Sequence, residues 1–173
     1  RILAPRGRYD EVVKALVDTI SLMPVGDPAD EGTVSGPLAN HKQQASVEEY
    51  IRKGVEEGAT IAFGGGKVEG LPSEVADGAF VQPTVFTGVD NSMRIAQEEI
   101  FGPVVQVIAY DTVDEAVAIA NDSEFGLAGA VYSTDHDAAL EVARRIRTGT
   151  VGINWYAFDP SAPFGGFKSS GLG

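Results

Sequence analysis

Short apolar runs and helical patterns alternate in residues 104–154, which read VVQVIAYDTVDEAVAIANDSEFGLAGAVYSTDHDAALEVARRIRTGTVGIN. The predicted order is strand, helix, strand, helix, strand, over residues 104–110, 112–120, 128–132, 137–147 and 150–154. Strands separated by helices of this length need crossover connections. We therefore expect the three strands to lie side by side in a parallel sheet that is covered by helices.

Polar residues stand where these two helices would begin. Thr112 precedes the first helix, and Asp135 or Asp137 precedes the second. A side-chain oxygen at such a position accepts a hydrogen bond from a backbone N–H that has no partner inside the helix. These residues are therefore predicted N-caps.

The first hundred residues contain helical and strand patterns as well. Apolar residues recur every three or four positions over residues 9–23, and a second helical pattern covers residues 42–57. Residues 25–40 are rich in Gly, Pro and Asp and predict an irregular connector, whereas residues 60–63 predict a short strand. A chain of 173 residues fits one compact core. We expect a three-layer α/β/α lobe with a mostly parallel sheet.

The composition excludes several classes of partner. Lys and Arg number 13 against 25 Asp and Glu, which gives a net charge of −12. Such an acidic chain repels phosphate backbones and anionic lipid surfaces, so we expect no nucleic acid and no membrane as a partner. No apolar run approaches the ~20 residues that span a bilayer, and no signal peptide pattern is present in the sequence. The expected location is the cytoplasm.

Cysteine is absent from the sequence, and His41 and His136 are its two histidines. The lack of cysteine excludes a disulfide framework, a thiolate metal site and a cysteine nucleophile within these residues. Two distant histidines also make a poor metal cluster, so no metal site is predicted.

The octet QEEIFGPV at residues 97–104 is the segment richest in functional side chains. Two carboxylates precede an aromatic residue, and the Gly-Pro pair then blocks a helix and starts a strand. A carboxylate at the end of a parallel strand can accept two hydrogen bonds from a sugar diol, and the aromatic ring can pack near a flat heterocycle. A solvated helix end that leads into a core strand has the same pattern, so spacing alone leaves both interpretations open.

The glycine-rich segments and Asn154 predict structural roles. Neither Gly64-Gly65-Gly66 nor Gly165-Gly166 with Lys168 has the strand-then-helix context of a phosphate loop, so we interpret both as turns. Asn154 follows the last predicted strand, where its amide could order the end of the sheet.

Five groups of residues resemble the aldehyde dehydrogenase superfamily in order and spacing. They are GDP at 26–28 with GPL at 36–38, QPTV at 82–85, the octet at 97–104, FGLA at 125–128 and PFGGFKSSG at 163–171. Together they cover nearly the whole chain. The resemblance implies that residues 1–173 are a partial catalytic domain of an enzyme that uses NAD or NADP to oxidise an aldehyde.

Site residues follow from the resemblance position by position. It implies that Glu99 accepts hydrogen bonds from the nicotinamide ribose and that Phe101 borders the nicotinamide ring. Gln43 stands where the family often places a glutamine at the cofactor edge, although an exposed helix residue fits the pattern equally well. Phe158 and Phe164 match a segment that lines the substrate tunnel, although core packing is the alternative role for each ring.

The same resemblance implies what these residues lack. The family attacks its aldehyde with a cysteine thiolate, and a separate glutamate activates the water that hydrolyses the thioester. Both groups, and the Gly-rich cofactor domain, are expected in an upstream part of the same polypeptide, and a helix and a strand used in oligomer contacts are expected downstream. We therefore expect these residues alone to be an inactive fragment of a homo-oligomer that acts on a small-molecule aldehyde.

Two other functions remain open. The residues can form a non-catalytic nucleotide-binding or assembly domain that keeps the fold, or they can belong to a superfamily relative that handles acyl-CoA thioesters or acyl phosphates.

Overall fold

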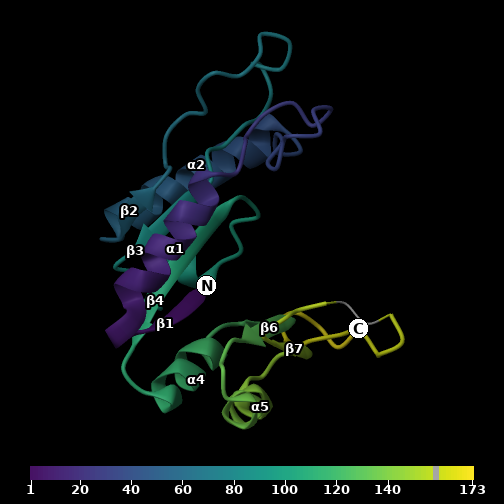
Figure 1. Ribbon diagram of the computed structural model, residues 1–173. Helices are drawn as coiled ribbons and strands as arrows, with labels where there is room; N and C mark the ends of the chain where they lie inside the picture. Colours follow the sequence, from purple (N-terminus) through teal and green to yellow (C-terminus); the bar gives the residue numbers. More distant parts are fainter. Residues whose placement is uncertain (158–159) are drawn as a thin grey trace. The chain divides into compact units, whose positions relative to one another are not determined.

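The computed structural model describes residues 1–157 and 160–173 (Figure 1). Its internal contacts divide the chain into two compact units, Arg1–Ala109 and Tyr110–Gly173. No helix among these described residues is long and apolar enough to cross a membrane.

A four-stranded sheet forms the centre of unit 1. Its strands, in spatial order, are β1 (Ile2–Pro5), β4 (Val104–Tyr110), β3 (Thr84–Thr87) and β2 (Thr60–Phe63). β3 and β4 run parallel, with Val85 opposite Val105, and β2 joins the edge of β3 in the antiparallel direction. The short helix η1 (Arg6–Arg8) links β1 to α1. Parallel pairing is therefore at the centre of this sheet, and the antiparallel pair lies at its edge.

Helices cover both faces of this sheet. α1 (Tyr9–Ser21) packs its apolar stripe on a cluster formed by Ala4, Val85 and Val107. The neighbouring Phe86 points to the other face, because successive side chains of a strand alternate, and its ring lies beside Gly54 of α2 (His41–Glu56). Each large apolar side chain removed from water in this way contributes about 1.5–3 kcal/mol. The predicted three-layer α/β/α arrangement with a mostly parallel sheet is confirmed.

Unit 2 contains a second, smaller parallel pair. Its elements are α4 (Val113–Asn121), β5 (Phe125–Gly126), β6 (Ala128–Val131), α5 (His136–Arg145), β7 (Thr150–Ile153) and β8 (Phe167–Lys168). β6 and β7 are parallel and in register over four residue pairs, and β5 and β8 form a short antiparallel ribbon. Thr112 and Asp135 cap α4 and α5 by accepting from backbone N–H groups, as predicted.

One expectation about the sheet is wrong. Residues 104–110 were expected beside the two later strands, but β4 pairs with β1 and β3, whereas β6 pairs with β7 in a sheet of their own. The reason is that β1 and β3 occupy both edges of β4, which leaves it no backbone groups for a further neighbour. Neither of these four-residue strands is predicted from the sequence.

Asn154 extends the parallel pair by one step after β7 ends. Its backbone N–H donates to Val131 O, and its side chain both accepts from Ser133 N and donates to Ser133 O, each at 2.8 Å. The residue has a φ of 57°, a left-handed conformation that Asn tolerates better than most residues. The side-chain amide thus takes the place of a peptide group, and the prediction that it orders the end of the sheet is confirmed.

A polar cluster joins α3 (Arg94–Gln97) to α2. The Arg94 guanidinium makes two hydrogen bonds to Glu98, both of 2.9 Å, and lies over the Tyr50 ring. Tyr50 OH donates to the same carboxylate at 2.7 Å. The hydrogen bonds from Arg94 and then Tyr50 lower the pKa of Glu98 from its ordinary 4.5 to about 2. The same contacts raise the pKa of Tyr50 and of Arg94.

Substitution of Asn154 tests its role in extending the sheet. Asn154→Ala removes both bonds to Ser133 and places a less tolerant residue in the left-handed region, so we expect a loss of about 1–2 kcal/mol of stability. Asn154→Gly keeps the backbone conformation, so it isolates the loss of the amide. Hydrogen exchange at the Ser133 amide should accelerate in both variants; unchanged protection there would contradict the role.

The pKa of Glu98 predicts a pH-dependent contribution to stability. A carboxylate with a lowered folded pKa stabilises the fold above its ordinary pKa of 4.5, and this contribution is lost as the pH falls towards 2. Glu98 is 42% exposed, so solvent screening limits the effect to below about 1 kcal/mol. The stability difference between the protein and its Glu98→Gln variant, measured by denaturant unfolding, should be largest above pH 5 and vanish near pH 2. A difference that stays constant from pH 7 to pH 3 would disprove it.

Candidate functional site

One face of α2 holds the segment that contains the predicted site. Gln43, Val47, Tyr50 and Gly54 are spaced at helical intervals on this face. They contact the chain from Ile95 to Gly102: Gly54 meets Ile95, Tyr50 bonds Glu98, and Val47 packs on Gly102. A Cβ atom at Gly102 would lie 2.6 Å from Val47 Cγ2, so only glycine allows this approach.

Phe101 has the least usual backbone of the segment. Its φ is 56°, in the left-handed region that non-glycine residues rarely adopt. The residue is also 72% exposed, whereas the preceding Ile100 is buried. An exposed aromatic ring on a strained backbone gains little from its own packing, which is typical of a residue held in place for a ligand.

Gln43 connects to this strained residue through the backbone. Its side-chain Nε2 donates to Ile100 O at 3.2 Å and to Phe101 O at 3.0 Å. The backbone N–H of Gln43 is itself bonded to the Asn40 side chain, which caps α2. The structure thus brings Gln43 and Phe101, 58 residues apart, into direct contact.

Glu98 and Glu99 differ in what surrounds them. Glu98 is engaged by Arg94 and Tyr50, as described above. Glu99 is exposed, and no residue in the described ranges 1–157 and 160–173 makes a hydrogen bond or an ion pair with its carboxylate. Its oxygen lone pairs are available to a ligand. Glu98 therefore has a structural role, whereas Glu99 can accept hydrogen bonds from outside the described residues.

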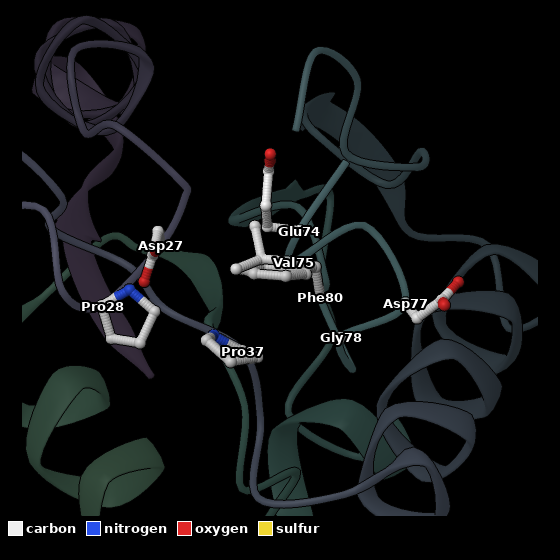
Figure 2. A pocket seen from close by; sticks show the side chains of 8 residues that line it. All are labelled: Asp27, Pro28, Pro37, Glu74, Val75, Asp77, Gly78 and Phe80. Atoms are coloured by element: carbon white, nitrogen blue, oxygen red, sulfur yellow. The ribbon is translucent and has the colours of Figure 1, made fainter. Parts of the chain in front are cut away.

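A pocket of unit 1 lies at a different place. It has a volume of about 290 Å³ and is formed by the connector before α2 and the loop before β3 (Figure 2). Its lining residues are Asp27, Pro28, Pro37, Glu74, Val75, Asp77, Gly78 and Phe80. Of the predicted site residues that the structure describes, none lines it.

The structure describes one of the two predicted tunnel residues. Phe164 belongs to unit 2 and is 54% exposed. Phe158 lies outside the described residues.

Lys168 and its glycines form a turn rather than an anion site. Lys168 Nζ donates to the carbonyls of Asn121 and Ser123 at the end of α4, where the helix has free acceptors. A Cβ atom at Gly165 would collide with the Leu172 carbonyl. The interpretation of this segment as a close-packed turn is confirmed.

Sequence reasoning missed the residues that support the site. Tyr50 and Arg94 were not singled out, although both hold Glu98. The available signal was the spacing of Gln43, Val47 and Tyr50, which places them on the face of α2 that packs inward.

Comparison with known proteins gives a consistent result. The family model described as "Aldehyde dehydrogenase family" matches residues 1–173. Geranial dehydrogenase from Castellaniella defragrans is 57% identical over the whole chain, which covers 35% of that protein. A putative aldehyde dehydrogenase from Staphylococcus saprophyticus is 50% identical, and the chain covers 36% of it.

Solved structures share the fold as well. The crystal structure of a Mycobacterium tuberculosis aldehyde dehydrogenase complexed with NAD+ superposes with a TM-score of 0.95 at 57% identity, over 100% of this chain and 35% of that one. An aldehyde dehydrogenase C mutant from Pseudomonas syringae, in complex with NAD+ and octanal, gives a TM-score of 0.92 at 49% identity, over 98% of this chain and 34% of that one. The chain thus spans about a third of the length of the relatives that it matches. With a family match along its full length and this shared architecture, the chain belongs to the aldehyde dehydrogenase family.

Proposed function

We propose that residues 1–173 are the carboxyl-terminal part of the catalytic domain of an NAD(P)-dependent aldehyde dehydrogenase, which oxidises an aldehyde to a carboxylic acid. Family membership supports the reaction class, and the NAD+ complexes of similar structures support the cofactor. An upstream part of the same polypeptide would supply the cysteine that forms the thioester, since the chain has none.

The pairing of a free carboxylate with an exposed aromatic ring carries this proposal. Among the described residues, none makes a hydrogen bond or an ion pair with the Glu99 carboxylate, and Phe101, two residues along, is exposed on a segment fixed by α2. A carboxylate can accept hydrogen bonds from two adjacent sugar hydroxyls, and an aromatic ring can pack beside a flat nicotinamide, so the residues fit the cofactor. When bound, NAD(P) accepts a hydride from the substrate.

The roles of individual residues follow from this fit. Glu99 accepts hydrogen bonds from the nicotinamide ribose and thereby limits the motion of the reactive ring. Phe101 borders the nicotinamide, and Gln43 lies at the edge of the same site. Phe158 and Phe164 contribute apolar walls for an uncharged carbonyl substrate. Relatives are named for geranial or bind octanal, so both aldehydes are suitable test substrates.

Two alternatives keep the same fold. An acyl-CoA- or acyl-phosphate-handling enzyme would use the same upstream cysteine and a different acceptor. A non-catalytic nucleotide-binding or assembly domain would keep Glu99 free without turnover. The cytoplasmic location and the homo-oligomeric state stay predictions.

Turnover by the isolated residues distinguishes a fragment from a complete catalyst. We expect no NADH or NADPH formation by residues 1–173 alone with geranial or octanal, because they contain no thiol nucleophile. The complete polypeptide should reduce NAD or NADP with an aldehyde. Robust turnover by the pure fragment would refute the assignment, and an inactive complete polypeptide that still binds a nucleotide would favour the non-catalytic alternative.

Substitution of Glu99 tests the ribose contact. In the complete polypeptide, Glu99→Gln should slow hydride transfer by about 10- to 100-fold, the loss expected for a charge-assisted hydrogen bond of about 1.5–3 kcal/mol. Acylation of the nucleophile by an activated ester, which needs no hydride transfer, should be unchanged. Single-turnover absorbance at 340 nm follows hydride transfer, and release of the leaving group of the ester follows acylation. Glu69→Gln, in an exposed loop of the same unit, is the matched control, and a Glu99 variant with wild-type hydride transfer would contradict the role.

A further inference from the structure

We propose that Lys168 is a positioning residue for the aldehyde site. Its ammonium group fastens the turn at residues 164–171 to the end of α4, and this turn holds Phe164 in the apolar wall of the substrate site. Lys168 acts through the backbone, without contact to the aldehyde. This inference rests on the proposed function, because it takes Phe164 as part of that wall.

The ammonium group of Lys168 is bonded within unit 2. Its Nζ donates to Asn121 O at 2.6 Å and to Ser123 O at 2.8 Å. Asn121 is the last residue of α4, where carbonyl groups have no N–H partner inside the helix and a positive charge is favourable. Two of the three N–H donors of the ammonium therefore join the turn to the end of this helix.

Lys168 stands at the point where the chain reverses direction. Its φ is 56°, a left-handed conformation that is unfavourable for a residue with a Cβ atom. Gly171 N–H donates to Lys168 O at 3.2 Å, and Gly166 N–H donates to Gly171 O at 2.8 Å, so the reversal brings residue 171 back beside residue 166. Such a backbone persists only where its surroundings determine it, and the two bonds of the Lys168 ammonium are part of that restraint.

The reversed chain lies directly against the backbone of Phe164. A Cβ atom at Gly173 would collide with the Phe164 carbonyl, and a Cβ atom at Gly165 would collide with the Leu172 carbonyl. At this packing density, residues 164–165 and 172–173 have no room to move independently. Phe164 is 54% exposed, so its own packing fixes it only in part. The position of its ring therefore depends on the turn that Lys168 fastens.

The residues after Lys168 fasten the same turn. Ser170 Oγ accepts from Gly126 N–H at 3.0 Å, and Ser169 N–H donates to Glu124 O at 2.9 Å. These partners lie in residues 121–126, as do the two carbonyls that Lys168 binds. Ser170→Ala therefore weakens the same attachment while it leaves the ammonium in place.

Substrate selectivity of the complete polypeptide tests the proposal. The variants are Lys168→Met, which keeps the apolar stem but removes the donors, Lys168→Arg, which restores charge and donors, Phe164→Ala, its combination with Lys168→Met, and Ser170→Ala. Lys67→Met, in an exposed loop of unit 1, is the matched control. Both kcat and KM are measured with octanal, whose long chain needs an apolar wall, and with acetaldehyde, which has a single methyl group. Hydrogen exchange of residues 164–173 is measured without substrate.

For a positioning residue, Lys168→Met should lower kcat/KM for octanal by about tenfold, mainly through KM, and for acetaldehyde by less than about twofold, because only the longer chain uses the wall. Lys168→Arg should recover most of this loss. In the Phe164→Ala background, Lys168→Met should cost less than about twofold, because the ring that it positions is gone. Exchange in residues 164–173 should accelerate in Lys168→Met and Ser170→Ala and not in Lys67→Met.

Equal losses for both aldehydes, or a full octanal loss in the Phe164→Ala background, would overturn the proposal, as would unchanged exchange. If Lys168→Met does not fold, Ser170→Ala must show the selective loss with octanal, and its absence would count against the role. A complete polypeptide that oxidises no aldehyde would instead reject the proposed function and with it the substrate role of Phe164, while the exchange measurement still tests the attachment of the turn.

Discussion

The contact between one face of α2 and the segment from Ile95 to Gly102 determines where the candidate site lies. Two glycines make it possible: Gly54 admits Ile95 and Phe86 against the helix, and Gly102 admits Val47. A side chain at either position would push the helix and the segment apart, because the nearest atoms already lie at or below van der Waals distance. The polar bonds of Gln43 and Tyr50 then fix the register of this packed pair.

The two adjacent acids on this segment, Glu98 and Glu99, have different electrostatic surroundings. Glu98 is surrounded by an arginine and a tyrosine hydroxyl, which stabilise its charge and tie α3 to α2. Glu99 carries the same charge with no partner in the described part of the chain. A carboxylate that is already satisfied would have to give up bonds to bind a ligand, whereas an unengaged one gives up only water. Among the described residues, Glu98 is therefore engaged by its neighbours and Glu99 is not.

The sequence predicted features that depend on neighbouring residues and failed where partners are distant. Thr112 and Asp135 cap their helices as expected, because a cap involves residues three positions apart. The strand at 104–110 was found, but its neighbours were wrong, since sheet partners are chosen by long-range pairing and neither β1 nor β3 was predicted as a strand. Glu99 and Phe101 were selected by resemblance to a family. The bond from Tyr50 to Glu98, which makes the two acids different, joins residues 48 positions apart and has no local signature.

The side-chain amide of Asn154 has a consequence for how the chain leaves the parallel pair of β6 and β7. The Asn154 side chain accepts from and donates to the Ser133 backbone, as a peptide group of a neighbouring strand would. The two strands therefore gain one more hydrogen-bonded position without another extended residue. The chain can turn away directly after β7, with Asn154 in the left-handed conformation, while the backbone groups of Ser133 keep their hydrogen bonds. The segment that follows then packs directly against the strand, since a Cβ atom at Gly152 of β7 would collide with the Trp155 carbonyl oxygen. The strand end therefore demands glycine at this position as well as the amide of Asn154.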